Sequence, residues 1–363
     1  MKRRIALAVA LAGCATGGAD GQGDVGLPTA GVGPFRKLAS SEVPGIAPFV
    51  LDERRAAFRD PGALARGAGA SGPEVWLYAV ARDASGKDVI VRSRATDGRA
   101  FFGTSQNGGR SPAVVLTPTE PWEGDALSGP APLVVGDVVY LYYAGKGGIG
   151  RARSTDGLTF TKDPGPILAR DPAVAFETSA PSSPSVARLP DGQLRMFYAG
   201  GAGIGEAESA DGLRFTRRDA IPATPALDPV LDRALPSPGE PAPFDAGEVA
   251  DPHVMLRVTS AGRLHVRVLY TGYDRPRGES PRVSAIGFAA RYGDAGPLER
   301  GGPVYSAGKG ERAPTAVEWG GRTLLYVEQS KDGLGGEPYR AIAGALAPAD
   351  QTLGAPDAFP EAP

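Results

Sequence analysis

The sequence predicts an all-β protein: a five-bladed β-propeller with four antiparallel strands in each blade. The chain of 363 residues contains 52 Gly and 35 Pro, too many for a helical protein but well suited to short strands joined by tight turns. A unit of sequence recurs along the chain, and turn residues divide each copy into four apolar runs. A ring of such units buries the faces of its sheets against one another.

The repeat is clearest in two segments that are offset by 55 residues. The first reads Tyr-Ala-Gly-Lys-Gly-Gly-Ile-Gly at 143–150 and continues as Ser-Thr-Asp-Gly-Leu-Thr-Phe at 154–160. It returns at 198–205 and 209–215, and weaker copies lie at 95–101 and 269–288. We interpret the Gly-rich stretches and the Asp-Gly pairs as turns between strands, because no helix follows them as a dinucleotide site requires.

An X-Pro pair opens the first strand of each unit, where proline is tolerated because that residue need not donate to the sheet. The five pairs are Asp60-Pro61, Gly129-Pro130, Ser183-Pro184, Asp251-Pro252 and Ala313-Pro314. A stretch with the pattern of an outer strand, residues 44–51, precedes the first unit and has no unit of its own. We therefore predict that this N-terminal strand pairs with the last blade and closes the ring.

The first 14 residues have the pattern of a secretion signal. Basic residues at 2–4 precede an apolar run at 5–11, and Leu11-Ala12-Gly13-Cys14 resembles the lipobox of bacterial lipoproteins. Cys14 would then be acylated and become the mature N-terminus, anchored to a membrane on the extracytoplasmic side of the cell envelope, at the outer membrane or cell surface. Residues 15–34 contain almost no large apolar residue and are expected to be a flexible tether, and residues 35–363 a single propeller domain. The alternative is an ordinary signal peptide with a chance cysteine.

The composition excludes several classes of function. The formal net charge is −2, so nucleic acid is not an expected partner. One cysteine cannot form an internal disulfide, and two histidines, His253 and His265, cannot build a His-rich zinc site. We therefore expect a monomer that needs no cofactor or metal and whose catalysis, if any, rests on carboxylates. A calcium ion with oxygen ligands stays an open alternative, although no loop has the spacing of a calcium loop.

Carboxylates gather in the connectors that lead into the inner strands. They are Asp60, Glu123, Asp125, Glu177, Asp245, Glu248, Asp251 and Glu311. Because strands alternate in direction, these connectors and the turns between the second and third strands of each blade should share one face of the ring. We expect the carboxylates to converge at the mouth of the channel on that face. The nearby Trp122, Phe176 and Phe244 either stack on sugar rings there or pack between blades.

The blades resemble those of glycoside hydrolase families 32, 43 and 68 and, more loosely, the family 130 phosphorylases. The resemblance covers about residues 44–355 and is carried by segments 140–145, 154–162, Pro166-Ile167-Leu168 and Phe58-Arg59-Asp60-Pro61. It implies activity on furanosyl-type glycosidic linkages. In those enzymes an Asp at the start of the first blade is the base or nucleophile, an Asp of the second blade tunes pKa values or stabilises the transition state, and a Glu of the third blade is the acid.

Carried over residue by residue, the resemblance assigns the catalytic roles to Asp60, Asp125 and Glu177. We expect Arg59 to hold Asp60 in its ionised form. Glu177 departs from the family pattern, because it lies seven residues before Pro184 instead of next to the proline. Each carboxylate is alternatively a solvated loop residue or a salt-bridge partner.

Further candidates for binding are Arg59, Glu248, Asp251, His253 and Glu311. The fourth-blade group of Glu248, Asp251 and His253 has no place in the family triad and competes for the role of site. Two functions stay open: a glycoside hydrolase, or a non-catalytic surface propeller that binds a glycan or a protein partner. The sugar, the linkage and the choice between inversion and retention are also left open, since they depend on distances in the folded protein.

The first prediction concerns the attachment of lipid to Cys14. Replacing the acylated residue, Cys14→Ser, removes the thiol that carries the lipid. Metabolic labelling with a radioactive fatty acid is expected to label the parent protein and not the variant, and fractionation should move the variant out of the membrane pellet. A variant that stays labelled and membrane-bound would show that the anchor lies elsewhere.

Overall fold

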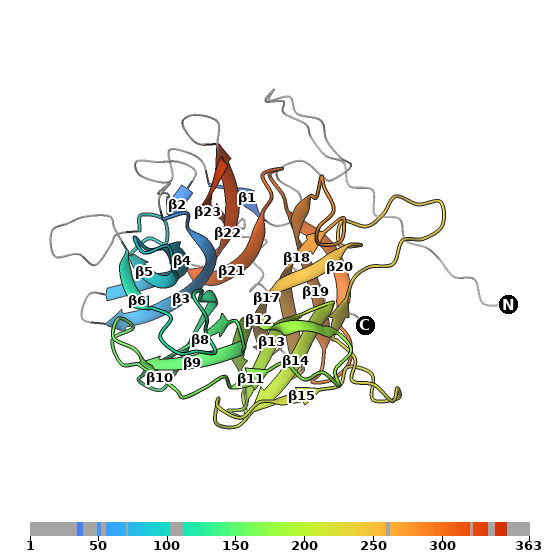
Figure 1. Ribbon diagram of the computed structural model, residues 1–363, viewed down its shortest axis with the longest axis horizontal. Coiled ribbons are helices and arrows are strands. Elements are labelled where there is room, and N and C mark those ends of the chain that lie inside the picture. Colours follow the sequence, from blue (N-terminus) through green and yellow to red (C-terminus); the bar gives the residue numbers. More distant parts are fainter. Residues whose placement is uncertain are drawn as a thin grey trace.

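The computed structural model describes residues 35–38, 49–51, 56–69, 72–101, 112–258, 262–319, 322–332 and 338–346. Every regular element in these ranges is a β-strand, and the strands form five antiparallel sheets around a central axis (Figure 1). The predicted five-bladed propeller with four strands per blade is confirmed. The described residues contain no helix of the length and apolar character needed to cross a membrane.

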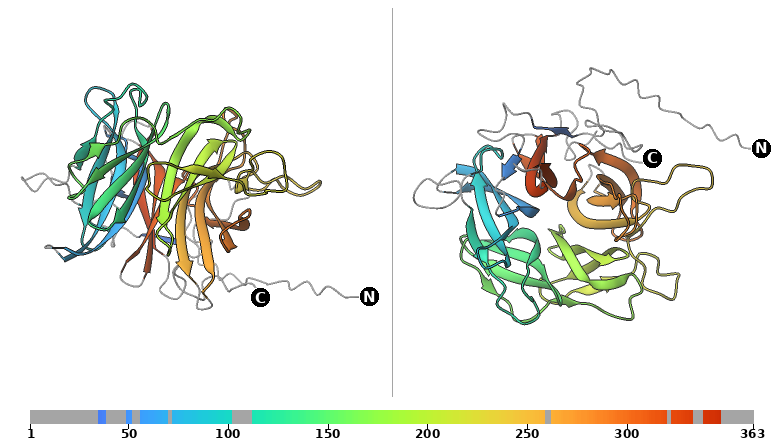
Figure 2. Two further views of the ribbon diagram at one scale, coloured as in Figure 1. Left: turned by 90° about the horizontal axis from the view of Figure 1, so that it is seen from below. Right: turned by 45° about the horizontal axis from the view of Figure 1, so that its top comes forward.

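Each of the first four blades runs from the centre outward in chain order (Figure 2). Blade 1 contains β3 (Arg59–Gly69), β4 (Gly72–Arg82), β5 (Asp88–Ala95) and β6 (Ala113–Leu116). Blade 2 contains β7 (Ser128–Val135), β8 (Val138–Gly145), β9 (Gly148–Ser154), β10 (Thr161–Lys162) and β11 (Leu168–Ala169). Blade 3 contains β12 (Glu177–Arg188), β13 (Leu194–Gly201), β14 (Gly203–Ser209), β15 (Thr216–Arg218) and β16 (Leu231–Asp232). Blade 4 contains β17 (Glu248–Val258), β18 (Leu264–Tyr273), β19 (Ser284–Tyr292) and β20 (Glu299–Tyr305).

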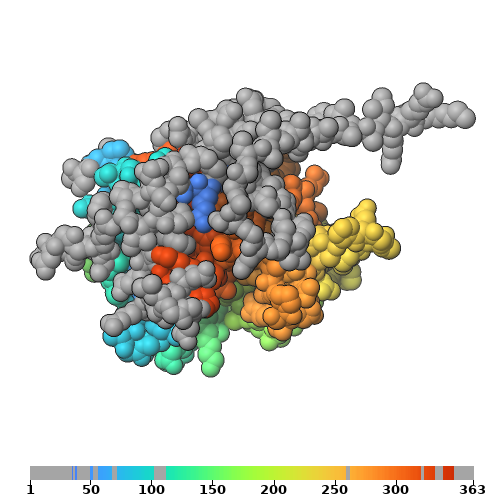
Figure 3. Space-filling view, turned by 90° about the horizontal axis from the view of Figure 1, so that it is seen from above, coloured from blue at the N-terminus to red at the C-terminus, as the bar shows by residue number. Residues whose placement is uncertain are grey.

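Blade 5 is built from both ends of the described chain. Its inner strands are β21 (Arg312–Trp319), β22 (Arg322–Asp332) and β23 (Pro338–Leu346), and its outer strand is supplied by β1 (Arg36–Lys37) and β2 (Phe49–Leu51). The register pairs Lys37 with Ala345, and Leu51 with Ile342. In Figure 3 the blue N-terminal residues lie against the orange-red strands of this blade.

The predicted closure by an N-terminal strand is therefore confirmed for residues 49–51, whereas residues 44–48 lie outside the described residues. The sequence did not predict the second piece, β1. Its presence follows the pattern of blades 2 and 3, whose outer strands are also split in two, as β10 with β11 and β15 with β16. The buried side chains Val50 and Leu51 belong to β2, and Phe35 and Leu38, which flank β1, are buried as well. The N-terminal segment is thus part of the core of blade 5.

The Gly-rich repeats serve packing as well as turns. Phe244 lies 6.0 Å from Tyr270 between ring centroids, and a Cβ placed on Gly287 would approach the Tyr270 ring to 2.4 Å. Trp122 on Tyr143 and Phe176 on Tyr198 repeat the same pair in blades 2 and 3. Of the two roles considered for Trp122, Phe176 and Phe244, the structure shows packing within the blades.

The Asp-Gly turns link neighbouring blades. Asp156 caps its own turn, because its Oδ1 accepts hydrogen bonds from the amides of Leu158 and Thr159, both at 2.8 Å. The carbonyl after such an Asp then accepts a tyrosine hydroxyl from the preceding blade, as Gly157 does from Tyr78 at 3.1 Å. The same contact from Tyr326 to Gly98, at 2.6 Å, joins blade 5 to blade 1. The interpretation of Asp97, Asp156 and Asp211 as turn residues is confirmed.

A pair of truncations tests the closure. Removing residues 1–34 leaves β1 and β2 in place, whereas removal through residue 51 exposes the edge of β23 and the apolar surface that Leu38, Val50 and Leu51 cover. We expect the shorter truncation to keep the parent melting temperature and the longer one to lower it by several degrees and to promote aggregation. Equal melting temperatures for the two truncations, measured by calorimetry, would contradict the closure.

Candidate functional site

The connectors into the inner strands and the turns between the second and third strands share one face, here called the upper face. Backbone hydrogen bonds join them in three blades: Gly147 donates to Trp122 at 2.8 Å, Ala202 to Phe176 at 3.1 Å and Gly247 to Tyr273 at 2.8 Å. This arrangement agrees with the expectation from strand alternation. Side chains from the starts of all five inner strands can therefore meet at the upper mouth of the channel.

The residue before each inner proline has a left-handed backbone. The φ angles are 46° at Asp60, 55° at Gly129, 47° at Ser183, 50° at Asp251 and 50° at Ala313. The register between inner and second strand also shifts at this point in every blade, which marks a β-bulge. Left-handed backbone is unfavourable for residues with a Cβ, so the surrounding fold imposes it at the same place in every blade.

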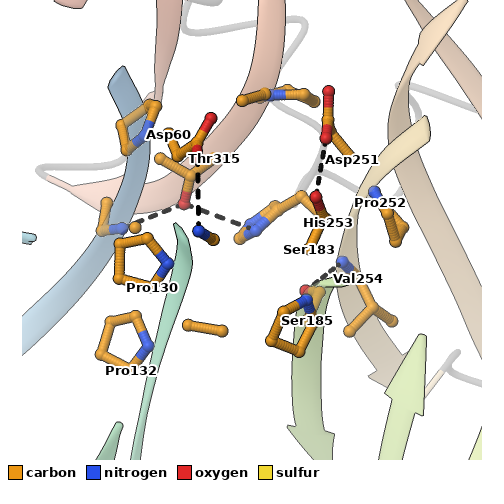
Figure 4. Close-up of a pocket in the computed structure, with 18 of the residues that line it drawn as sticks. Asp60, Pro130, Pro132, Ser183, Ser185, Asp251, Pro252, His253, Val254 and Thr315 are labelled. Atoms are coloured by element: carbon orange, nitrogen blue, oxygen red, sulfur yellow. Dashed lines mark hydrogen bonds between the residues drawn. The ribbon is translucent and has the colours of Figure 1, made fainter. Parts of the chain in front are cut away.

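These five residues form a ring around the channel that we call the neck: Asp60, Gly129, Ser183, Asp251 and Ala313. With the residues that follow them, they line a central cavity of about 60 Å³ (Figure 4). That volume accommodates a few water molecules but not a sugar ring. Only blades 1 and 4 place carboxyl groups in the neck, so Asp60 and Asp251 are the acidic pair at the centre of the molecule.

Asp60 is surrounded by features that favour its neutral form. Burial, followed by the negative charges of Glu328 and Asp251, raises the pKa of Asp60 to about 7 and outweighs the opposite effects of Arg312 and Arg59. The expectation that Arg59 keeps Asp60 ionised is therefore not met. The Arg59 guanidinium pairs instead with Asp88, with Nη2 2.6 Å from Oδ1.

Asp251 is held by hydroxyl groups from two blades. Ser183 of the neck donates to Oδ1 at 2.8 Å, and Thr271 of β18 donates to Oδ2 at 3.0 Å. The Thr271 hydroxyl in turn accepts the amide of Ala313 at 2.9 Å. Both carboxylate oxygens of Asp251 thus act as acceptors and have fixed positions.

A buried ion cluster supports the neck from blade 5. Glu328 of β22 accepts the amide of Asp60 at 3.2 Å and the Nε of Arg312 at 2.7 Å, and it also pairs with Arg340. Burial alone would raise the pKa of Glu328, but the two guanidinium groups hold it below its usual value. Tyr273 completes this region: the Arg282 guanidinium lies 3.5 Å from the centre of its ring, and burial and the charge of Asp251 raise its pKa.

Glu177 lies away from the neck, in a structural contact. It is 1% exposed, and it accepts the Tyr198 hydroxyl at 2.8 Å and the Arg217 Nε at 2.6 Å. The same acid, tyrosine and cation recur as Glu123 with Tyr143 and Lys162 in blade 2, and as Asp245 with Tyr270 and Arg300 in blade 4. The geometry assigns Glu177 to this repeated blade contact, which leaves no oxygen of Glu177 facing the neck cavity.

The other candidates are distributed around the site. Asp125 is exposed, and its backbone carbonyl accepts the amide of Asp88 at 3.2 Å. The structure therefore does not bring Asp60, Asp125 and Glu177 together. Glu311 is fully buried and accepts Gln329 Nε2 at 2.8 Å, and Glu248 pairs with Arg277 at 2.9 Å and with Arg282.

His253 lines the cavity next to the neck. Its Nε2 lies 3.0 Å from the Ala316 carbonyl oxygen, and burial lowers its pKa to about 4, so the ring is neutral at pH 7. Within the described residues no group of three or more His, Cys, Asp or Glu is arranged to hold a metal ion. Cys14 lies outside the described residues.

Solved structures share the fold of this chain, whereas searches with the sequence find no match. The sequence matches no protein-family model and no curated protein. A protein from Bacteroides ovatus described as a glycoside hydrolase is 14% identical with a TM-score of 0.60, and the match covers 89% of this chain and 99% of that one. A thermostable family-43 glycoside hydrolase is 16% identical, with a TM-score of 0.52 and 85% and 96% coverage. A family-32 β-fructofuranosidase from Bombyx mori, solved with sucrose, is 14% identical, with a TM-score of 0.54 and 82% and 61% coverage. The chain therefore has the propeller fold of these hydrolases.

The raised pKa of Asp60 predicts a pH dependence of stability. Between the ordinary carboxyl pKa, near 4, and about 7, the folded protein binds more protons at Asp60 than the unfolded chain does, so this group's contribution to stability falls as the pH rises through that window. In Asp60→Asn the fall in the free energy of unfolding that is due to Asp60 should disappear. The difference in the free energy of unfolding between variant and parent should therefore shift in favour of the variant from pH 4 to pH 8. Urea unfolding from pH 4 to 8 measures the effect, and parallel pH profiles for the two proteins would refute it.

Proposed function

We propose that the protein acts on a glycan at its upper mouth and hydrolyses a glycosidic linkage there, with Asp60 and Asp251 as the two carboxyl groups. The observation that carries the proposal is the pair itself: two carboxyl groups from blades 1 and 4 face one cavity, in environments that differ. Asp60 has a pKa of about 7, whereas Asp251 accepts two hydroxyl hydrogen bonds. Glycosidases need such a pair, one member protonated and the other ionised.

In the proposed reaction Asp60 donates its proton to the glycosidic oxygen as the bond from that oxygen to the anomeric carbon breaks. Asp251 is the ionised partner and either activates a water molecule or attacks the anomeric carbon, according to its separation from Asp60. Water supplies the hydroxyl of the new reducing end. Its other proton passes to Asp251 where Asp251 activates the water, after which exchange with solvent restores both carboxyl groups, and to Asp60 where the water hydrolyses a covalent intermediate on Asp251. These roles differ from those that the resemblance implies, where the first-blade Asp is the base or nucleophile.

The size of the neck limits where the linkage is cleaved. A cavity of about 60 Å³ excludes a sugar ring, so the reacting sugar lies above the neck and only the carboxyl groups reach up to it. Tyr273 lies near Asp251, Arg312 and Arg282, and in the proposal its hydroxyl is a hydrogen-bond donor for the sugar. Furanosyl linkages, such as those of arabinans and fructans, are the proposed substrates.

The location of the protein is part of the proposal. Lipid on Cys14 and the tether of residues 15–34 would hold the propeller as a monomer at the cell envelope, outside the cytoplasm. Polymeric glycans too large to enter the cell are accessible there.

Glycan binding without cleavage is the second candidate. The resemblance places the catalytic acid in the connector that contains Glu177. Tyr198 and Arg217 donate hydrogen bonds to both oxygens of the Glu177 carboxylate, so this residue is not available as the acid, which favours binding over cleavage. In that case Asp60, Asp251 and the arginine residues around them recognise sugar hydroxyls instead of breaking a bond.

Substitutions at the neck test the proposal. The purified protein is assayed on arabinofuranosyl, fructosyl, xylosyl and mannosyl substrates. Asp60→Asn and Asp251→Asn should each reduce kcat by about a hundredfold or more, as loss of a general acid or base does, with folding intact by circular dichroism.

Glu177→Gln supplies the contrast, because it breaks the blade contact with Arg217 and should lower the melting temperature while the folded fraction keeps its specific activity. Activity that survives both neck substitutions would overturn the assignment. Binding to glycans with no cleavage by the parent protein would favour the second candidate.

A further inference from the structure

We propose that a groove between blades 3 and 4 on the upper face binds additional units of a neutral oligosaccharide whose reacting end lies at the neck. This inference rests on the proposed function and specifies the ligand as a chain of several sugars instead of a disaccharide. It concerns residues that have no part in the neck.

The groove has a volume of about 700 Å³, within the range of small-molecule sites. It is formed by the start of β12, the end of β16, the start of β17 and the loop after β18. Its polar lining includes Thr178, Ser179, Asp232, Arg233, Glu248 and Arg277. The connector from β16 to β17 contributes Arg233 and Gly247 to the lining, and it extends outward from the propeller (Figure 1).

A continuous set of contacts connects the groove with the neck. Glu248 lines the groove and lies on β17, three residues before Asp251 of the neck. Arg282 pairs with Glu248 and lies over the ring of Tyr273, whose pKa is raised by burial and by Asp251. Asp251, Tyr273, Arg282 and Glu248 are therefore neighbours, and in the proposal the ligand extends over them from the neck to the groove.

The chemistry of the lining fits a neutral sugar chain. Carboxylates, guanidinium groups and hydroxyls occur together, which suits the mixed donors and acceptors of sugar hydroxyls. The lining has three carboxylates, Asp228, Asp232 and Glu248, and two guanidinium groups, Arg233 and Arg277. Arg277 is already paired with Glu248 at 2.9 Å. The apolar part of the lining, with Leu227, Pro229 and Pro276, can pack against the CH faces of sugar rings. A polyanionic glycan would meet three carboxylates here with little compensating charge.

The test is a variant in which a large side chain fills the groove. Ala202 is exposed and lines the groove at the turn between β13 and β14, so Ala202→Trp places an indole in the binding volume. Thr178→Trp fills the same space from β12 if the first variant folds poorly. The matched control is Lys146→Trp, in the corresponding exposed turn of blade 2 on the same face.

Calorimetric titrations use arabinan, fructan, xylan and mannan oligosaccharides of two and of six units, and an oligogalacturonate as the charged comparison. The parent and Lys146→Trp should bind the six-unit form of one of these sugars at least tenfold more tightly than its two-unit form. Ala202→Trp should bind the six-unit form no more tightly than the two-unit form, and its affinity for the two-unit form should equal that of the parent.

Equal affinity of the parent for both lengths, an undiminished gain in both groove variants, or preference for an oligogalacturonate would each overturn the inference while leaving the proposed function intact. Failure of the parent to bind or cleave any of these glycans would instead contradict the proposed function, and the inference would fail with it.

Discussion

The left-handed residue before each inner proline is the constraint on which the neck depends. A proline disfavours helical backbone in the residue before it, and a Cβ disfavours left-handed backbone, yet four of the five positions carry a side chain. The bulge at this point shifts the register of each inner strand and lets the five strands approach the axis closely. A Cβ on Gly62, for example, would come within 1.9 Å of the Pro130 carbonyl oxygen. Five equivalent bulges therefore form one ring, and only the side chains on it differ between blades.

Hydrogen bonds between adjacent blades keep this ring in place. The amide of Val254 donates to Ser185 at 2.9 Å, and the amide of Ala63 donates to Thr315 at 3.0 Å, so that blade 3 is joined to blade 4 and blade 5 to blade 1. The neutral His253 adds a contact between blades 4 and 5. The acidic pair thus stands on a rigid, buried scaffold, a requirement for holding two carboxyl groups at fixed separation.

The sequence predicted the architecture because its signals are local and repeated. The X-Pro pair recurs in all five blades, the Asp-Gly turn after the third strand in blades 1 to 3, and the Tyr-Ala-Gly segment in blades 2 and 3. The X-Pro pairs therefore give the number of blades. The candidate site was less predictable. Glu177 belongs to a set that also repeats, since Tyr198 and Arg217 lie 55 residues after Tyr143 and Lys162. A side chain with equivalents in several blades serves the blade, and this signal was available in the sequence. The raised pKa of Asp60 was not, because it depends first on burial in the folded protein and then on the charge of Glu328 of blade 5, which lies 268 residues away in the chain.

The split outer strand of blade 5 has a consequence for the order of biosynthesis. The ribosome releases β1 long before β23, and the pairing of Arg36 with Leu346 must wait until nearly the whole chain is made. Until then four blades stand as an open arc, with Tyr326 and its Gly98 acceptor still unjoined. Contacts of such sequence separation form slowly, and an open arc exposes sheet edges that favour association with other chains. Pairing of β1 and β2 with β23 covers the last unpaired edge of blade 5, so ring closure is also the step that removes this risk of association.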